Sequence, residues 1–175
     1  MARHAVETDR LLLRRWLDKD YAPFAEICAD PAVMRYIGNG STRTAEQASK
    51  AIIKFETEWA EKGYGLFAVE QKQTGEFIGF TGFSWPGFLP EVLPSVEIGW
   101  RFSKHCWGNG YASEAASAAL SYGTSALHLT DIVSIYQIGN AASERIMQKL
   151  GMVFDCKTVD PTCGRDVAVY RLPQG

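Results

Sequence analysis

A seven-residue loop in the second half of the chain has the composition of a phosphate-binding site. It reads Trp-Gly-Asn-Gly-Tyr-Ala-Ser over residues 107–113. A strand-like run, Val96–Phe102, precedes it, and an alanine-rich helical run extends from Ser113 to about Ala126. Gly108 and Gly110 leave little side-chain bulk at the start of the helix, where unpaired N–H groups and the helix dipole attract anions. The loop therefore predicts a site for a cofactor that carries phosphate.

Two common phosphate-binding motifs do not fit this loop. A P-loop requires a lysine directly after its last glycine, whereas Tyr111 follows Gly110 here. A dinucleotide-binding fingerprint requires GxGxxG or GxGxxA at the first strand–helix turn, with an acidic residue about 20 residues later. The present loop lies past the middle of the chain and has Ser113 at the last motif position, and Asp131 alone does not restore the pattern. A different phosphate-bearing cofactor is therefore expected.

The composition of the 175-residue chain is that of an ordinary globular protein, with 46% hydrophobic and 22% charged residues. This length favours one domain over residues 1–175. A formal net charge of −2 argues against a broad nucleic-acid-binding surface, and no apolar run reaches the roughly 18 residues of a membrane helix. The first nine residues lack the apolar core of a secretion signal. We therefore expect a cytoplasmic chain with no membrane or nucleic-acid partner.

The cysteines and histidines do not have the spacing of a metal site. The four cysteines lack any CxxC pair, and the three histidines, at positions 4, 105 and 128, are scattered. Cys156 and Cys163 fit two half-buried thiols better than a pair that faces across a hairpin. No metal and no disulfide framework are expected, which suits a reducing compartment.

Hydrophobic periodicity and turn residues predict a mixed α/β chain with helices on both faces of a sheet. The expected strands are Thr8–Trp16, Leu66–Gln71, Phe77–Phe83, Ser95–Phe102, Ile132–Ile138, Met152–Lys157 and Arg165–Leu172. The expected helices are Tyr21–Ala29, Thr44 to about Lys62, Ser113 to about Ala126, and Asn140–Leu150. The last two strands are expected to form an antiparallel pair.

Local signals set several boundaries of these elements. Asp18 is placed to cap the first helix, which Asp30-Pro31 ends. Thr44 and Gln47 form a capping box at the start of the second helix. The apolar loop 83–93 is expected to expose its side chains, which makes a homodimer plausible.

The ordered motifs resemble those of the GNAT superfamily of N-acetyltransferases, whose pyrophosphate loop follows Q/R-x-x-G-x-G/A. Here Trp107 replaces Gln or Arg, as in the ribosomal-protein Nα-acetyltransferase-like branch. Further features of that branch are matched by Thr8 to Arg14, Glu97-Ile-Gly99-Trp100, Trp107 to Ala115, and Asn140-Ala-Ala-Ser143 with Lys149-Leu-Gly151. The resemblance spans nearly the whole chain. It implies the GNAT fold, with a mixed, mostly antiparallel twisted sheet of about six to seven strands and helices on both faces.

The resemblance also implies transfer of an acetyl group from acetyl-CoA to a primary amine by direct attack in a ternary complex. The strand before the loop is expected to hold the pantetheine arm, the loop its diphosphate, and Asn140 the pantetheine amide while it also caps its helix. The cofactor-binding residues implied are Trp100, Arg101, Phe102, Trp107, Gly108, Asn109, Gly110, Tyr111, Ala112, Ser113 and Asn140.

Two catalytic roles follow from the same resemblance. Glu97 lies at the general-base position, although a structural role, such as pairing with Arg101, is equally open. Ser143 matches the proposed general acid of the ribosomal branch, although a serine there also suits hydrogen bonding at a helix N-terminus. Met147 stands where many members carry a tyrosine acid, so that mechanism is excluded. A backbone N–H from a bulge near Gly99 is the expected oxyanion donor.

The acceptor is not set by the sequence. Tyr36 and Trp85 are candidates for its pocket, and plain core or dimer contacts are the alternative for such aromatic residues. Protein N-termini and small amines are both open as acceptors. A non-catalytic acyl-CoA-binding module of the same fold is the alternative function.

Overall fold

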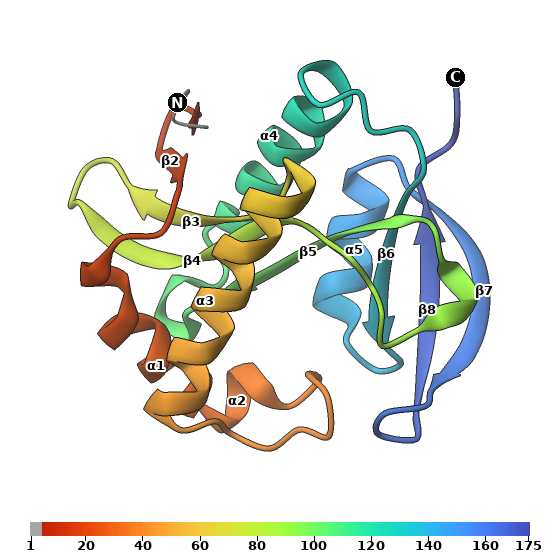
Figure 1. Ribbon diagram of the computed structural model, residues 1–175, viewed down its shortest axis with the longest axis horizontal. Coiled ribbons are helices and arrows are strands. Elements are labelled where there is room, and N and C mark those ends of the chain that lie inside the picture. The colour runs from red at the N-terminus through yellow and green to blue at the C-terminus, as the bar shows by residue number, and fades with distance from the viewer. Residues whose placement is uncertain (1–4) are drawn as a thin grey trace.

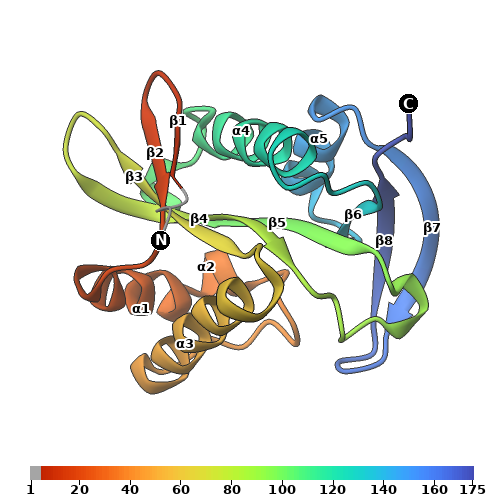
Figure 2. The ribbon, with the colours of Figure 1, turned by 45° about the horizontal axis from the view of Figure 1, so that its top comes forward.

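The computed structural model describes residues 5–175, which form one eight-stranded sheet with helices on both of its faces (Figures 1 and 2). The strand order is β1-β2-β3-β4-β5-β6-β8-β7, and all neighbours are antiparallel except β5 and β6, which are parallel. The strands are β1 Val6–Glu7, β2 Leu11–Arg14, β3 Leu66–Gln71, β4 Glu76–Ser84, β5 Val96–Phe102, β6 Ile132–Gln137, β7 Val153–Asp160 and β8 Arg165–Arg171.

The helices divide between the two faces as Figure 2 shows, with α4 and α5 on one face and α1, α2 and α3 on the other. Their bounds are α1 Tyr21–Ala29, α2 Pro31–Met34, α3 Ala45–Lys62, α4 Tyr111–Ser125 and α5 Ala141–Lys149. The predicted mixed fold and its terminal antiparallel pair are confirmed, and α2 is an additional short helix that begins at the proline expected to end α1. No helix in the described part of the chain is long and apolar enough to cross a membrane.

The start of α3 is fixed by the predicted capping box. The backbone N–H of Gln47 donates to Thr44 Oγ1 at 3.2 Å, and the N–H of Thr44 donates to Gln47 Oε1 at 2.9 Å. The helix ends at Gly63, which takes the left-handed conformation with φ 73°. Between these ends, Ile52 and Trp59 are buried against the sheet. Local chemistry therefore places this helix with little help from the rest of the fold.

The predicted first strand, Thr8–Trp16, is shortened to β2, Leu11–Arg14. Residues 8–10 form a turn, because Thr8 Oγ1 donates to Glu114 Oε1 at 2.6 Å and accepts from the N–H of Leu11 at 2.9 Å. The guanidinium of Arg10 also binds Glu114, at 2.6 Å. A carboxylate on α4 therefore holds the turn before β2, and the two-residue β1, which precedes the predicted strand, adds to the seven strands expected.

The predicted cap at Asp18 is wrong. Asp18 begins a 3-10 turn, Asp18–Asp20, and Asp20 precedes α1 without a side-chain capping bond. The carboxylate of Asp20 is fully buried and accepts instead from both terminal nitrogens of Arg14, at 2.7 and 2.9 Å. A buried ion pair thus takes the place of the expected cap.

The loop 83–93 exposes Trp85 but buries most of its other large apolar side chains. Leu89 and Val92 are buried with Val133, Val167 and Val169 beneath the β6–β8 part of the sheet. Leu89 and Val92 belong to the core, so of the larger apolar side chains in this loop Trp85 is the one left exposed for a contact between subunits.

The parallel pair β5–β6 is joined over only two residues. The paired positions are Val96 with Ile132 and Glu97 with Val133, although both strands continue beyond them. Ser134 Oγ then donates to the carbonyl of Ile98 at 2.8 Å, across the point where the strands part. β5 pairs with β4 in unbroken register from Glu97 to Phe102, so the predicted bulge near Gly99 is wrong. The irregularity lies between β5 and β6.

Helix α4 rests directly on the sheet at Gly123, where a Cβ would meet the buried ring of Phe83. Replacing Gly123 with alanine would raise helix propensity by about 1 kcal/mol. Overpacking typically costs about 1–3 kcal/mol. We expect Gly123→Ala to lower the free energy of unfolding in urea, with exposed Ser121→Ala on the same helix as control. An equal or raised stability for Gly123→Ala would contradict this packing.

Candidate active site

Two helix N-termini lie at the same end of the parallel strands. α4 follows the carboxyl end of β5, and α5 follows the carboxyl end of β6. Since parallel strands have their carboxyl ends at one edge, both helices begin beside the opening between β5 and β6. Their positive dipole ends therefore flank this opening on the α4–α5 face of the sheet.

The glycine loop forms an open cradle at the first of these N-termini. Gly108 and Gly110 have φ values of 79° and 78°, which are costly for residues with a Cβ. A Cβ on Gly108 would meet no atom within 4 Å, and Gly110, the N-cap of α4, makes no side-chain capping bond. The backbone N–H groups of the first turn are thus left for a ligand, and the space suits a diphosphate.

Side chains of the glycine loop itself hold the loop in place through hydrogen bonds. Trp107 is half exposed, and its indole N–H donates to the carbonyl of Phe102 at 3.0 Å. The amide of Asn109 donates to the carbonyls of Cys106 and Trp107, at 3.1 and 3.2 Å. These bonds tie the loop to the end of β5 and keep its glycines in the left-handed region.

Arg10 is a cation beside the cradle that the sequence reasoning did not single out. Its guanidinium lies 4.4 Å from the centre of the Tyr111 ring and reaches to 3.5 Å from where a Cβ on Gly110 would stand. Glu114 fixes it there. Burial alone would raise the pKa of Glu114, but hydrogen bonds from Thr8 and Arg10 outweigh it and lower that pKa. The signal for Arg10 was the turn at residues 8–10, which the sequence pattern hid inside a strand.

The edge of β5 faces the opening with part of its backbone. The N–H of Val96 donates to the carbonyl of Asp131 on the β6 side, and strand alternation turns Ile98, Trp100 and Phe102 the same way. Arg101 turns its backbone toward β4. Its side chain lies on the face of α1 and α3, with Nη1 3.5 Å from the Cys28 sulfur. Trp100 and Phe102 therefore line the opening with main-chain groups, and Arg101 does not.

Glu97 lies on the α3 face of β5, in the last pair before β5 and β6 part. Burial, together with the charge of nearby Glu58, raises its pKa to about 8, and a hydrogen bond from Ser84 opposes that rise. The second carboxylate, Glu58 on α3, was not found from the sequence. Burial raises its pKa despite Lys54, Lys62 and the backbone N–H of Trp85. Only the packing of α3 across the sheet brings these two acids together.

Ser143 and Asn140 occupy the first turn of α5. The side chain of Asn140 accepts from the backbone N–H of Ser143 at 3.3 Å and donates to Ser143 Oγ at 3.1 Å. Met147 is buried in the core beneath them. Ser143 and Glu97 thus flank the opening from different faces of the sheet, and Ser143 Oγ retains its own proton for donation.

The two aromatic candidates for the acceptor pocket lie apart. Trp85 directly follows Ser84, which pairs with Glu97, and the ammonium of Lys62 lies 4.7 Å from the centre of its ring. The ring of Tyr36 packs at Gly139, in the turn between β6 and α5. The structure therefore places one at each end of the β5–β6 region, and no contact brings them together.

Segment 35–39 is fastened to the sheet near Tyr36. Gln137 donates to the carbonyl of Gly38 at 2.6 Å, and Arg165 donates to the carbonyls of Arg35 and Asn39 at 2.8 and 2.6 Å.

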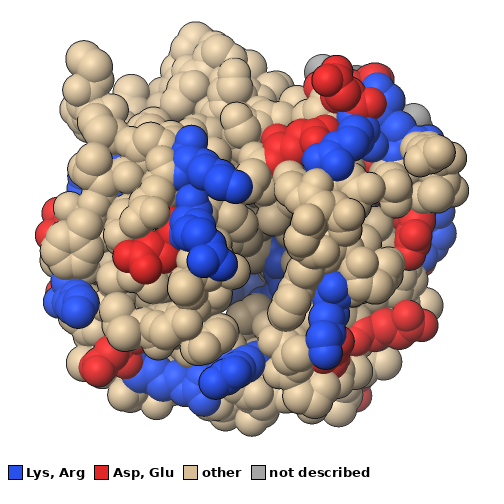
Figure 3. Space-filling model, turned by 180° about the vertical axis from the view of Figure 1, so that it is seen from behind, with Lys and Arg blue, Asp and Glu red and all other residues tan. Residues whose placement is uncertain are grey.

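On the side of the molecule turned away in Figure 1, a central hollow carries Lys and Arg side chains along its rim and on its floor (Figure 3). A ligand that enters there meets a positive surface.

The remaining histidines do not assemble a metal site. His105 bonds Ser103 and Glu76 at 2.6 and 3.0 Å, on the α1 side of the sheet. Within residues 5–175, no three His, Cys, Asp or Glu side chains are placed to hold a metal ion, and His4 lies outside the described residues. The four cysteines are free thiols, with Cys156 and Cys163 half-buried.

Comparison with known proteins points to one family. A family model described as an acetyltransferase (GNAT) domain matches residues 10–153. The uncharacterized N-acetyltransferase YoaA of Bacillus subtilis (strain 168) is 36% identical over 146 residues, which cover 83% of this chain and 81% of the relative.

Solved structures have the same fold. The GNAT-family acetyltransferase from Bacillus anthracis has a TM-score of 0.79 at 28% identity, covering 97% of this chain and 98% of that chain. RimL, a ribosomal L7/L12 alpha-N-protein acetyltransferase in complex with coenzyme A, has a TM-score of 0.77 at 13% identity, with 97% of each chain covered. This second likeness is one of fold alone.

The pairing of Glu58 with Glu97 predicts a measurable coupling. Replacing Glu58 with glutamine removes one of the two causes of the raised pKa of Glu97, so that pKa is expected to fall below 8 while burial keeps it above the ordinary range. Carboxyl-carbon NMR titration measures it directly. Glu61→Gln, an exposed neighbour on α3, is the control, and an unchanged Glu97 pKa in Glu58→Gln would show that the two acids do not interact.

Proposed function

Because the chain belongs to the GNAT family of acetyltransferases and is an N-acetyltransferase, we propose that it moves an acetyl group from acetyl-CoA to a primary amine by direct attack in a ternary complex. The observation that carries this proposal is the opening between β5 and β6, with a bare helix N-terminus on one face and Glu97 on the other. The proposal places the enzyme in the cytoplasm, where its four free cysteines stay reduced.

The glycine loop and the edge of β5 would hold acetyl-CoA. The N–H groups of Tyr111, Ala112 and Ser113 are suited to the diphosphate, and Arg10 adds a positive charge beside them. The main-chain groups of Trp100 are directed into the opening, where an extended pantetheine amide can pair with them as an added strand would. The resulting path ends close to Gly99, which leaves open space for the thioester.

Glu97 would accept the proton of the acceptor amine. An ammonium with a pKa of about 10 must lose a proton before its nitrogen can attack a carbonyl. A carboxylate with a pKa of about 8 is a far better base near neutral pH than an ordinary glutamate. Acetyl-CoA supplies the carbonyl that the amine attacks. Because the attack is direct, no side chain of the enzyme needs to be acetylated.

Ser143 would act as the general acid at the other side of the opening: its hydroxyl would give its proton to the departing thiolate and take one up again from water. Since Asn140 already donates to Ser143 Oγ, the hydroxyl hydrogen is free to point toward the departing thiolate. A thiol with a pKa near 8.5 needs little such help, so the contribution of Ser143 is expected to be smaller than that of Glu97. Acceptors of both classes, protein N-termini and small amines, suit these steps.

The cradle is tested by placing an acidic side chain in it. Gly110→Glu should abolish coenzyme A binding in calorimetry, because the side chain fills the anion site, repels the phosphates and is strained at φ 78°. Gly164→Glu is a matched control, since Gly164 has φ 73° and equally open surroundings in the β7–β8 turn. Unchanged affinity for coenzyme A in folded Gly110→Glu would remove the loop from the proposal.

The base is tested by kinetics against pH. Glu97→Gln should lower kcat by about 10²–10⁴-fold, with little change in acetyl-CoA affinity. In the wild type, activity should fall as the pH drops through about 8, because Glu97 takes up a proton and no longer accepts one. The exposed Glu91→Gln variant should keep the wild-type profile. Equal turnover of Glu97→Gln and wild type would exclude Glu97 as the base.

A further inference from the structure

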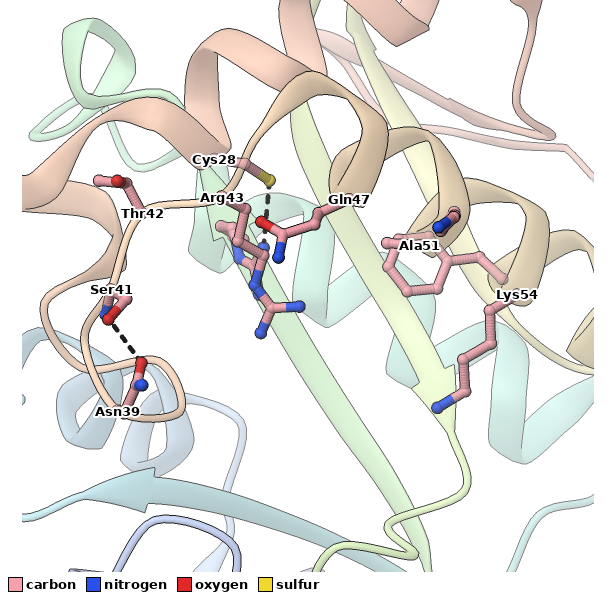
Figure 4. A pocket seen from close by; sticks show the side chains of 11 residues that line it. Cys28, Asn39, Ser41, Thr42, Arg43, Gln47, Ala51 and Lys54 are labelled. Carbon is pink, nitrogen blue, oxygen red and sulfur yellow. Dashed lines mark hydrogen bonds between the residues drawn. The ribbon is translucent and has the colours of Figure 1, made fainter.

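A cavity of about 550 Å³ lies on the α3 face of the sheet, beside the position proposed for the acceptor. It is enclosed by α1, by the segment that leads into α3, by α3 itself and by the end of β5 (Figure 4). The residues that line it are Cys28, Asn39, Ser41, Thr42, Arg43, Gln47, Lys50, Ala51, Lys54, Phe55 and Arg101. Four of these are cations, and none is an acid.

The positive charge of this cavity is largely unpaired. Of the four cations, Lys50 alone forms an ion pair within residues 5–175, with exposed Glu46 at 2.8 Å. The side chains of Arg43 and Lys54 extend into the cavity in Figure 4. A site with this charge and without carboxylates favours a negatively charged ligand.

Arg101 gives the strongest indication. Within the described residues its buried Nε has no hydrogen-bond partner, and Nη1 has only the Cys28 thiol at 3.5 Å, which is a weak acceptor. Its guanidinium lies 5.1 Å from the centre of the Phe80 ring. Burial, with Arg43 nearby, lowers the pKa of Arg101. Arg101 as a whole is half-buried, but a buried Nε without a partner is costly, and an anionic ligand would relieve that cost.

The cavity and the proposed reaction site lie on the same face of β5. Glu97, Gly99 and Arg101 alternate onto the same face of β5, so the Glu97 and Arg101 positions are about 13 Å apart at the usual rise of a strand. Gly99 lies between them, and a Cβ on it would meet nothing within 4 Å. An acceptor that lies along this face of β5 would reach both Glu97 and Arg101. The glycine cradle begins α4 on the opposite face, so this cavity is separate from the diphosphate site.

We propose that the cavity binds a carboxylate of the acceptor, so that the natural acceptor is an amine that carries a carboxylate within about 13 Å of its nitrogen. This inference rests on the proposed function and adds the substrate class. The acids at Glu58 and Glu97 receive the ammonium end, and Arg43, Lys54 and Arg101 receive the carboxylate end. Two kinds of acceptor meet this description: small amino acids in which a long chain separates the amine from the carboxylate, and peptides in which an acidic residue follows the N-terminal residue.

The test compares acceptors that differ only in charge. 6-Aminohexanoate is paired with its amide, and the peptide Ala-Glu-Ala-amide with Ala-Gln-Ala-amide. We expect kcat/KM to favour the carboxylate member of at least one pair by roughly ten- to a hundredfold, the range typical of a charge-assisted contact. The pair that shows the preference distinguishes small-molecule from peptide acceptors.

Variants locate the preference in the cavity. Arg43 is exposed, so Arg43→Gln should fold, and it should reduce the ratio of kcat/KM for the carboxylate member to kcat/KM for the amide member by about tenfold. Arg101→Gln should act in the same direction. The control Lys157→Gln, exposed on β7, should keep the full preference. Equal kcat/KM for carboxylate and amide members in the wild type would overturn the inference while leaving acetyl transfer intact.

A binding measurement tests the anion site without relying on turnover. Glutarate, a dicarboxylate without an amine, should shift the side-chain NMR signals of Arg43 and Arg101, and the Arg43→Gln variant should weaken that response. If no amine releases coenzyme A from acetyl-CoA, the proposed function fails. If, in that case, glutarate still shifts the Arg101 signal, the anion site itself stands; no shift would overturn it too.

Discussion

The parting of β5 from β6 is the constraint on which the rest of the site depends. Two parallel strands that stay paired would leave no main-chain edge for a ligand, and α4 and α5 would begin beside a closed sheet. Here the ladder ends at Glu97 and Val133, and the last bridging contact is the bond from Ser134 to the carbonyl of Ile98. Beyond it, the far end of β6 is held elsewhere: Gln137 and Arg165 bind the 35–39 segment. Each such bond contributes only about 1 kcal/mol, while β6 stays paired with β8 from Val133 to Gln137, beyond the point where it leaves β5.

The sheet also separates two electrostatic environments. On the α4 side lies a helix N-terminus with Arg10 next to it, which favours phosphate. On the α3 side, Glu58 and Glu97 lie at one end of a floor and Arg101 at the other. The pKa of each acid is raised above its ordinary value by burial, and the charge of Glu58 adds to the rise at Glu97. A ligand with a positive and a negative end is therefore complementary to the α3 side in one orientation only.

Local signals in the sequence were sufficient for much of the framework. The capping box at Thr44, the glycine end of α3 and the turn at Gly108–Gly110 depend on residues within a few positions of one another, so their pattern can be read directly. Features that depend on distant partners were missed. The break at Thr8 requires Glu114, 106 residues away, and the burial of Leu89 requires strands that come later in the chain. The same limit applies to the site: Glu97 follows from a motif, whereas Glu58 and the cavity at Arg101 arise from packing alone.

The glycine loop and the cavity at Arg101 differ in how much sequence change each can accept. The cradle is built from main-chain groups and from glycines whose φ values few other residues tolerate, so it accepts little change. The cavity proposed for the acceptor is built from side chains on α1, on α3 and the segment before it, and on β5, and Arg43 and Lys54 are exposed on its rim. Substitutions of exposed side chains usually alter stability by less than about 0.5 kcal/mol. We therefore expect that acceptor preference can change at these rim positions without loss of the fold, while the strained glycines and the packing of α4 would keep the proposed cofactor site fixed.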